Sequence, residues 1–125
     1  MAMRVAGWLL HPDDRESLLA IFPPAYPRVV AHHVTLKAGV RPDYPLPSDT
    51  EGSVVGVADD GAGVQAFVVE IGGTKRRPDG STYHITWSLV AGREAVESND
   101  VIRERGWTPS PQRHRVRLEP KVFSS

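Results

Sequence analysis

Glycine and proline most strongly limit what this chain can fold into. There are 11 of each among 125 residues, and they recur without a fixed period. Proline cannot continue a helix, and glycine weakens the interiors of helices and strands, so we expect many turns and no long helix. Hydrophobic residues make up 40% and charged residues 24%, values typical of a globular protein rather than a disordered one. A chain of this length is expected to form one domain, residues 1–125.

The order of apolar and turn-forming segments predicts an α+β fold. Apolar and β-branched runs predict strands over residues 3–10, 29–38, 53–58, 64–71, 81–90 and 113–122. A first helix should begin near Pro12 and stop before Pro23, with a buried side formed by Leu18, Leu19, Ile21 and Phe22. A second short helix should run from Ser98, as its N-cap, to Arg105, just before Gly106.

Three further segments are predicted to be turns or loops. Asp59 to Gly63 separates two apolar runs and indicates a hairpin. The prolines of residues 41–48 predict a loop. Residues 72–80 should form an exposed, mobile loop that holds Lys75, Arg76 and Arg77.

Charge and cysteine content exclude several classes of function. The formal net charge is zero, so no overall positive field is available to coat a long nucleic acid. Without cysteine the chain has no disulfide, iron–sulfur cluster, thiolate zinc site or thiol nucleophile. No apolar run has the length of a signal-peptide core or a membrane span, so we expect a cytoplasmic protein.

One pattern occurs twice: His33-Val34-Thr35-Leu36 and His84-Ile85-Thr86-Trp87. Residues i and i+2 of a strand share a face about 7 Å apart, so each histidine should lie beside a threonine. In the second copy Ser88 extends the same face. The repeat predicts a polar site formed by two imidazoles and two hydroxyls.

The other three histidines lack this pattern. Alternation along the strand should send His32 to the apolar side, partly buried and with a structural role. His11 and His114 are also interpreted as structural.

Two imidazoles and two hydroxyls suit hydrolysis of a cyclic phosphodiester. A base must take a proton from the attacking water while an acid gives one to the leaving ribose oxygen, and histidine can hold either state near neutral pH. Hydroxyl donors would stabilise the charge on the non-bridging oxygens. A strained five-membered ring is reactive enough to need no metal ion.

The paired motifs resemble those of the two-histidine (2H) phosphoesterase superfamily. The segments from Phe22 to Leu36 and from His84 to Asn99 are similar to cyclic phosphodiesterase domains associated with RNA-ligase repair enzymes. The resemblance implies a two-lobed, pseudo-symmetric α+β enzyme without a cofactor, acting on nucleotides or RNA with a 2′,3′-cyclic phosphate. It further implies that His33 and His84 are the acid–base pair and that Thr35 and Thr86 bind phosphate. A monomer is expected, but the sequence leaves the oligomeric state open.

Further contacts to an anion can be suggested from position. Lys37 shares the His33 face, Arg76 lies in the loop before the second motif, and Ser88 shares the His84 face. For each of the two basic residues, an ordinary solvated charge is the better explanation. Residues 101–125 carry six bases against two acids, so the arginines of the last strand could also flank an anion site.

Two other functions are compatible with parts of the sequence. The pairs Asp13-Asp14 and Asp59-Asp60 could bind a metal with the histidines, but a helix start and a hairpin turn explain them better. A sensor that binds RNA ends or nucleotides without turnover remains the alternative to an enzyme. The motifs leave open which histidine is the base, which ribose oxygen leaves, and whether the substrate is a free nucleotide, an RNA end or an ADP-ribose cyclic phosphate.

Overall fold

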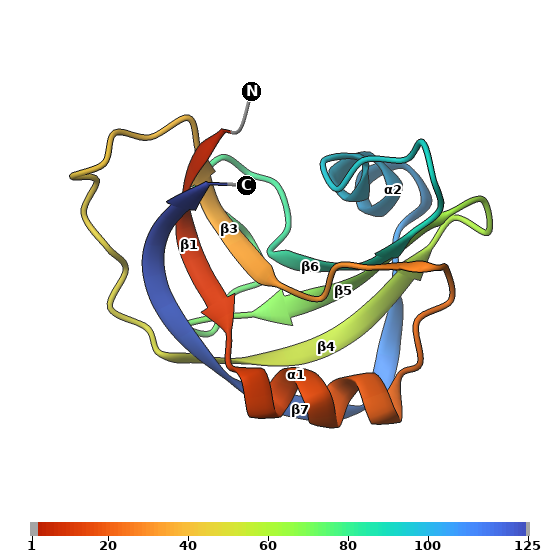
Figure 1. Ribbon diagram of the computed structural model, residues 1–125. Coiled ribbons are helices and arrows are strands. Elements are labelled where there is room, and N and C mark those ends of the chain that lie inside the picture. Colours follow the sequence, from red (N-terminus) through yellow and green to blue (C-terminus); the bar gives the residue numbers. More distant parts are fainter. Residues whose placement is uncertain (1–2, 125) are drawn as a thin grey trace.

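The computed structural model describes residues 3–124, which form a mixed α+β protein with one antiparallel sheet of seven strands and two helices (Figure 1). The strands are β1 (Arg4–Leu10), β2 (Arg28–Val29), β3 (His33–Ala38), β4 (Glu51–Asp59), β5 (Val64–Glu70), β6 (His84–Leu89) and β7 (Thr108–Ser124). The helices are α1 (Pro12–Ile21) and α2 (Glu97–Arg105). The expected α+β class is therefore confirmed.

The strands lie in the order β2-β6-β5-β4-β7-β1-β3. The long β7 joins the two parts of the sheet, because it pairs with β4 on one side and with β1 on the other. The sheet curves so strongly that β3, at one end of this order, comes round to face β6 near the other end (Figure 1).

The strand predicted over residues 29–38 is divided in two. β2 pairs with β6, whereas β3 pairs with β1. Between them Ala31 has a positive φ of 44°, and its N–H donates to the carbonyl of Thr86 at 3.0 Å. The prediction of one strand was wrong because this segment crosses from β6 to β1.

Two clusters of buried side chains fill the two sides of the sheet. The larger cluster includes Trp8, Phe67 and Trp87, and α1 covers it through Leu18. The smaller includes Val64 and Val68 of β5 and is covered by Val101 and Ile102 of α2. Phe67 and Val68 are neighbours that point to opposite sides, as strand geometry requires.

The first helix matches the prediction except at one residue. It begins at Pro12, and the Nδ1 atom of His11 accepts the N–H of Asp13 at 3.1 Å as an N-cap. Leu18, Leu19 and Phe22 pack on the core. Ile21 was expected on the buried side, but it is 53% exposed at the last position of the helix.

The second helix starts earlier than predicted. It runs from Glu97, with Val96 at the N-cap position, so Ser98 is not the cap. Ser98 is instead fully buried, and its hydroxyl bonds the side chain of Thr86. Gly106 follows the helix as expected, with a φ of 73°.

The last strand is also longer than predicted, beginning at Thr108 rather than at residue 113.

The arginines of β7 do not flank an anion site. Arg113 pairs with Glu70, Arg115 with Glu51 and Arg117 with Asp14, all with exposed guanidinium groups. The bond from Arg117 holds the pKa of Asp14 below its ordinary value. The local excess of positive charge is therefore matched by carboxylates from other strands and α1.

Neither helix within residues 3–124 is long and apolar enough to cross a membrane.

Gly7 allows β3 to lie close against β1, where the register shifts between Ala6 and Gly7. A Cβ atom at Gly7 would collide with the backbone carbonyl of Val34. We expect Gly7→Ala to destabilise the protein by about 3 kcal/mol, because β3 must move away. Urea unfolding measures this loss.

Gly92 provides the control. Its φ is 88°, but a Cβ atom there would meet no neighbour, so Gly92→Ala should cost only about 1 kcal/mol of backbone strain. Equal unfolding midpoints for Gly7→Ala and the unmodified protein would contradict the close approach.

Candidate functional site

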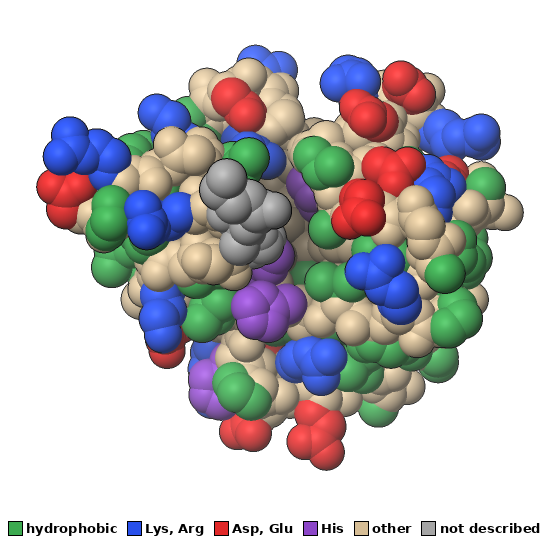
Figure 2. Space-filling model, turned by 45° about the horizontal axis from the view of Figure 1, so that its top comes forward, with side chains coloured by type: hydrophobic (Ala, Val, Ile, Leu, Met, Phe, Trp, Pro, Cys, Tyr) green, Lys and Arg blue, Asp and Glu red, His purple; other side chains and the backbone are tan. Residues whose placement is uncertain are grey.

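Both His-x-Thr motifs line one cleft of about 460 Å³. Each occupies the first and third positions of a six-residue strand, β3 or β6, so the motifs are placed alike in the two strands. Figure 2 shows histidine side chains along a groove that divides this face of the molecule. The described residues that line the cleft are Met3, Val5, His33, Thr35, Ala38, Arg77, His84, Thr86, Glu94, Ala95, Val96 and Asn99.

His84 is held in one tautomer. Its Nδ1 atom lies 2.9 Å from the carbonyl oxygen of Thr82, which can only accept, so Nδ1 carries the proton and Nε2 keeps its lone pair. The side chain is 9% exposed, and burial lowers its pKa. The charge of Arg77 lowers the pKa further. His84 is therefore a neutral imidazole with a bare nitrogen at neutral pH.

His33 is also a neutral imidazole at neutral pH. Burial, with smaller contributions from His32 and His84, lowers its pKa to about 4. Its Nδ1 atom lies 3.0 Å from Nδ1 of His32, so one ring donates a hydrogen bond to the other. Phe123 of β7 packs edge-on against the His33 ring with centroids 4.9 Å apart.

His32 does not lie where alternation predicted. It is exposed rather than partly buried in the apolar side, because the crossing at Ala31 interrupts the strand and changes the direction of the next side chain. Its backbone carbonyl accepts the N–H of Leu10 at 2.9 Å. Its ring is thus a solvent-accessible hydrogen-bond partner of a cleft histidine.

Two hydrogen bonds hold the side chain of Thr86. The Thr86 hydroxyl donates to the carbonyl of Ala95 at 3.2 Å and lies 2.8 Å from the hydroxyl of Ser98. Because Thr86 has a single hydroxyl proton, Ser98 must be the donor in that second bond. Thr35, the equivalent residue of β3, lines the cleft and is partly exposed.

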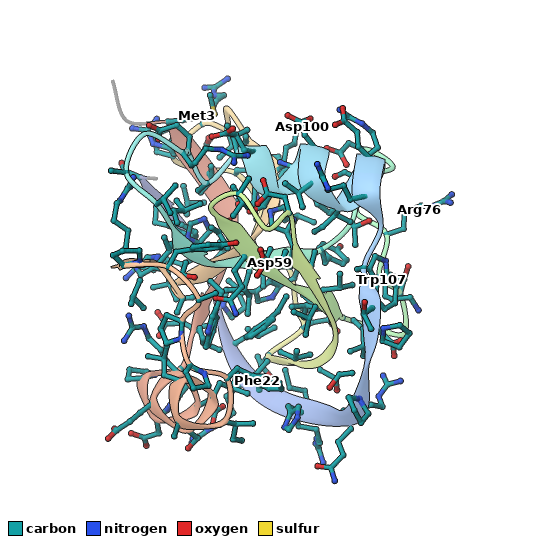
Figure 3. The ribbon with its side chains drawn as sticks, turned by 90° about the vertical axis from the view of Figure 1, so that its right-hand side faces the viewer. Met3, Phe22, Asp59, Arg76, Asp100 and Trp107 are labelled. Atoms are coloured by element: carbon teal, nitrogen blue, oxygen red, sulfur yellow. The ribbon has the colours of Figure 1, made fainter. Side chains whose placement is uncertain are left out.

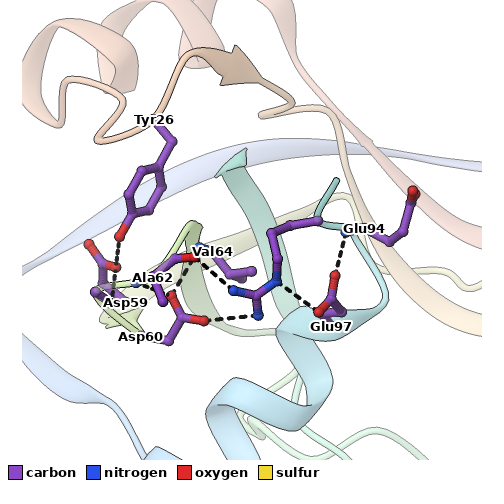
Figure 4. Close-up of polar contacts among 9 residues, drawn as sticks. Tyr26, Asp59, Asp60, Ala62, Val64, Glu94 and Glu97 are labelled. Carbon is purple, nitrogen blue, oxygen red and sulfur yellow. Dashed lines mark hydrogen bonds and ion pairs between the residues drawn. The ribbon is translucent and has the colours of Figure 1, made fainter. Parts of the chain in front are cut away.

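Arg93 fixes the start of α2 beside the cleft. Its guanidinium bonds Asp60 at 2.9 Å, Glu97 at 2.8 Å and the carbonyl of Ala62 at 2.9 Å (Figure 4). The carboxylate of Glu97 also accepts the N–H of Glu94. The hairpin turn is thereby tied to the helix that supplies Ser98 and Asn99.

Three residues suggested as anion contacts lie outside the cleft lining. Lys37 is exposed, with Nζ 5.6 Å from the ring centroid of Tyr44. Arg76 is exposed and projects away from the ribbon (Figure 3). Ser88 is fully buried and donates to Gln65 at 2.6 Å, which gives it a structural role.

Sequence reasoning missed Arg77 and Asn99, both of which line the cleft. Arg77 is 7% exposed, so the segment 72–80 is not exposed throughout as predicted. The Oδ1 atom of Asn99 is buried without a hydrogen-bond partner among the described residues. Nothing in the local sequence distinguishes the buried Arg77 from the exposed Arg76. Asn99 could be placed in the cleft only once the preceding residue of α2, Ser98, is known to face inward.

The acidic pairs considered as metal ligands have other partners. Asp14 pairs with Arg117, and Asp60 pairs with Arg93. Asp59 accepts the hydroxyl of Tyr26. Within residues 3–124, no group of three or more histidine, aspartate or glutamate side chains is arranged to hold a metal ion.

No protein-family model, curated protein sequence or solved structure matches this chain.

The lowered pKa of His33 makes stability depend on pH. An unfolded chain takes up a proton near pH 6.5, whereas folded His33 resists protonation until about pH 4. Between these values the unfolded state binds more protons, so the free energy of unfolding should fall as pH falls. In His33→Gln this contribution is absent, and the loss of stability between pH 6.5 and pH 4 should be smaller.

Urea unfolding at several pH values in this window measures both slopes. His114→Gln, changed outside the cleft beside Phe22, is the reference for losing a histidine as such. Parallel pH dependence in His33→Gln and the unmodified protein would show that folded His33 titrates normally.

Proposed function

We propose that the cleft hydrolyses a 2′,3′-cyclic phosphate to a phosphomonoester by acid–base catalysis with His33 and His84, without a metal ion. The observation that carries this proposal is the convergence of two His-x-Thr pairs on one cleft. A cleft of about 460 Å³ is within the range that small-molecule sites occupy and is large enough for one nucleotide.

The reaction needs two opposite proton transfers. Water attacks phosphorus and loses a proton to the base, a new P–O bond forms, and the bond from phosphorus to one ribose oxygen breaks. That oxygen takes a proton from the acid and becomes a hydroxyl. Afterwards the acid has lost a proton and the base has gained one, and exchange with water resets the pair.

The hydrogen bonds of the two rings favour one assignment of roles. His84 has a bare Nε2 atom, because its Nδ1–H is used by Thr82, so it is suited to act as base. When His33 is doubly protonated, its Nδ1–H can donate to His32 and its Nε2–H remains for the leaving oxygen. His33 is therefore the proposed acid.

The threonines bind the phosphate in this proposal. Thr86 turns its hydroxyl proton from the Ala95 carbonyl to a non-bridging oxygen while Ser98 continues to donate to it. A hydroxyl that receives a hydrogen bond is a better donor, so Ser98 strengthens this contact. Thr35 supplies the corresponding hydroxyl from β3.

We also propose that the fold is pseudo-symmetric and two-lobed, with β3 and its neighbours β1 and β7 in one lobe and β6, β5 and β4 in the other. The matching positions of the motifs at the starts of β3 and β6 support this. The proposed substrates are nucleotides or RNA ends with a cyclic phosphate. A sensor that binds these ligands without turnover is the second candidate, and the same assay distinguishes it.

Removing either histidine should abolish most turnover. In EDTA, the protein should convert 2′,3′-cyclic nucleotides or a cyclic-ended oligonucleotide to monophosphates, as followed by phosphorus NMR. His33→Ala and His84→Ala should each lower kcat by about a hundredfold or more, as expected for loss of a general acid or base. The rate of the unmodified protein should show a bell-shaped pH profile.

His114→Ala is the matched control, because His114 packs against Phe22 and does not line the cleft. Wild-type rates in both cleft variants would exclude histidine catalysis. Saturable binding with no product in any substrate would favour the sensor.

Binding of an anion should draw a proton into the cleft. Both histidines have lowered pKa values when the cleft is empty, and a negative ligand favours the imidazolium form. Sulfate is a suitable probe because its own charge is constant near neutral pH. Calorimetry near pH 6.5 in buffers of different ionisation enthalpy should therefore show proton uptake on sulfate binding.

The uptake should shrink in His33→Ala. A binding enthalpy that does not vary with the buffer would contradict the proposed change in protonation.

A further inference from the structure

Arg77 is a buried cation in a segment whose other basic residues are exposed. It is 7% exposed, whereas Lys75 and Arg76 lie at the surface. Lys75 pairs with Glu70, and Arg76 projects outward (Figure 3). Arg77 is also the only lysine or arginine among the described residues that line the cleft.

A tight turn fixes the backbone of Arg77. Its N–H donates to the carbonyl of Ser81 at 2.8 Å, and its carbonyl accepts the N–H of Gly80 at 2.9 Å. The carboxylate of Asp79 accepts both the N–H and the hydroxyl of Ser81. Gly80 has a φ of 90°, which favours glycine at this position. The turn is thus built to hold the arginine in one place.

The guanidinium is only partly satisfied. Its Nη2 atom pairs with Asp79 at 3.2 Å, but Nε is buried and has no hydrogen-bond partner among residues 3–124. An unpaired donor on a buried charged group is costly, so such a group normally has a partner. Because Arg77 lines the cleft, an acceptor for its guanidinium group can be supplied from there.

We propose that Arg77 binds the anionic group of the cleft ligand, with a guanidinium N–H donating to a phosphate oxygen and Asp79 orienting the guanidinium through Nη2. The identification of this anion as a phosphodiester rests on the proposed function. The binding of a tetrahedral anion by Arg77 is independent of that function. In the reaction this donor would stabilise negative charge on phosphorus oxygens without reorganising, because the turn already holds it.

The position of Arg77 also affects the neighbouring histidine. Its charge helps to keep the pKa of His84 low, which preserves the bare nitrogen. Arg77 would therefore attract the anion and keep the base unprotonated before the anion arrives. Among the described residues of the cleft lining, the one acidic residue, Glu94, is exposed.

The test compares two adjacent arginines with sulfate as the probe. Sulfate is titrated into the unmodified protein, Arg77→Gln, Arg77→Lys and Arg76→Gln, and binding is followed by NMR of the histidine rings. Arg77→Gln should weaken sulfate binding by about tenfold or more, the usual effect of losing a charge-assisted hydrogen bond. Arg77→Lys should recover part of the affinity, and Arg76→Gln should stay within about twofold of the unmodified protein.

A second measurement does not depend on the folding of a variant. In the unmodified protein, the Nε–H resonance of Arg77 should move as sulfate is added, while that of Arg76 should not. An immobile Arg77 resonance, or unchanged affinity in folded Arg77→Gln, would overturn the proposal.

The outcomes separate this inference from the proposed function. If sulfate moves the Arg77 resonance but no cyclic phosphate is consumed, the anion site stands and the hydrolysis does not. If cyclic phosphate is hydrolysed and Arg77→Gln leaves both KM and kcat unchanged, the hydrolysis stands and the role of Arg77 is wrong.

Discussion

The crossing of the chain from β6 to β1 determines where both histidines lie. The N–H groups of Val30 and Ala31 donate to the carbonyls of Trp87 and Thr86, so this segment is bonded to β6 immediately before β3 begins. Ala31 adopts a left-handed conformation, which costs a non-glycine residue about 1 kcal/mol, and its side chain is fully buried. Two backbone hydrogen bonds and buried packing offset that cost. As a result His33 begins its strand on the same cleft as His84.

The polar groups of the cleft depend on contacts from outside the sheet. Thr86 is supported by Ser98, which α2 brings to it, and α2 is tied to the hairpin turn through Arg93. His84 is oriented by the backbone of Thr82, which belongs to the segment before β6. Thr86 and His84 therefore each have a neighbour that limits their rotation, an arrangement suited to a site that must bind one geometry closely.

Periodicity in the sequence was sufficient for much of the fold. The helix from Pro12, the hairpin around residues 59–63 and the strand of the second motif were predicted from local pattern, because apolar alternation and turn residues agree there. The break at Ala31 was not predictable, since nothing in Val30-Ala31-His32 marks a left-handed residue. It follows from pairing with β6, a contact between segments distant in the chain.

Part of the candidate site was also predictable from the sequence. The i, i+2 spacing correctly brought His33, Thr35, His84 and Thr86 to one cleft. It could not distinguish Arg77 from Arg76, because the choice between them depends on a turn closed by Ser81. The local sequence predicts Ser98 as a helix cap, but its hydroxyl instead bonds Thr86 of β6, a contact that the local sequence does not reveal.

The position of β7 has a consequence for how the chain reaches this structure. Arg4 pairs with Ser124, so contacts between the first and last strands span almost the whole chain, a topology that slows folding. On a ribosome, β4, β5 and β6 can pair before β7 emerges, but β1 and β3 have no strand that joins them to that group. The cleft can therefore assemble only after β7 has been synthesised, and a nascent chain would carry both histidine motifs before it could use them together.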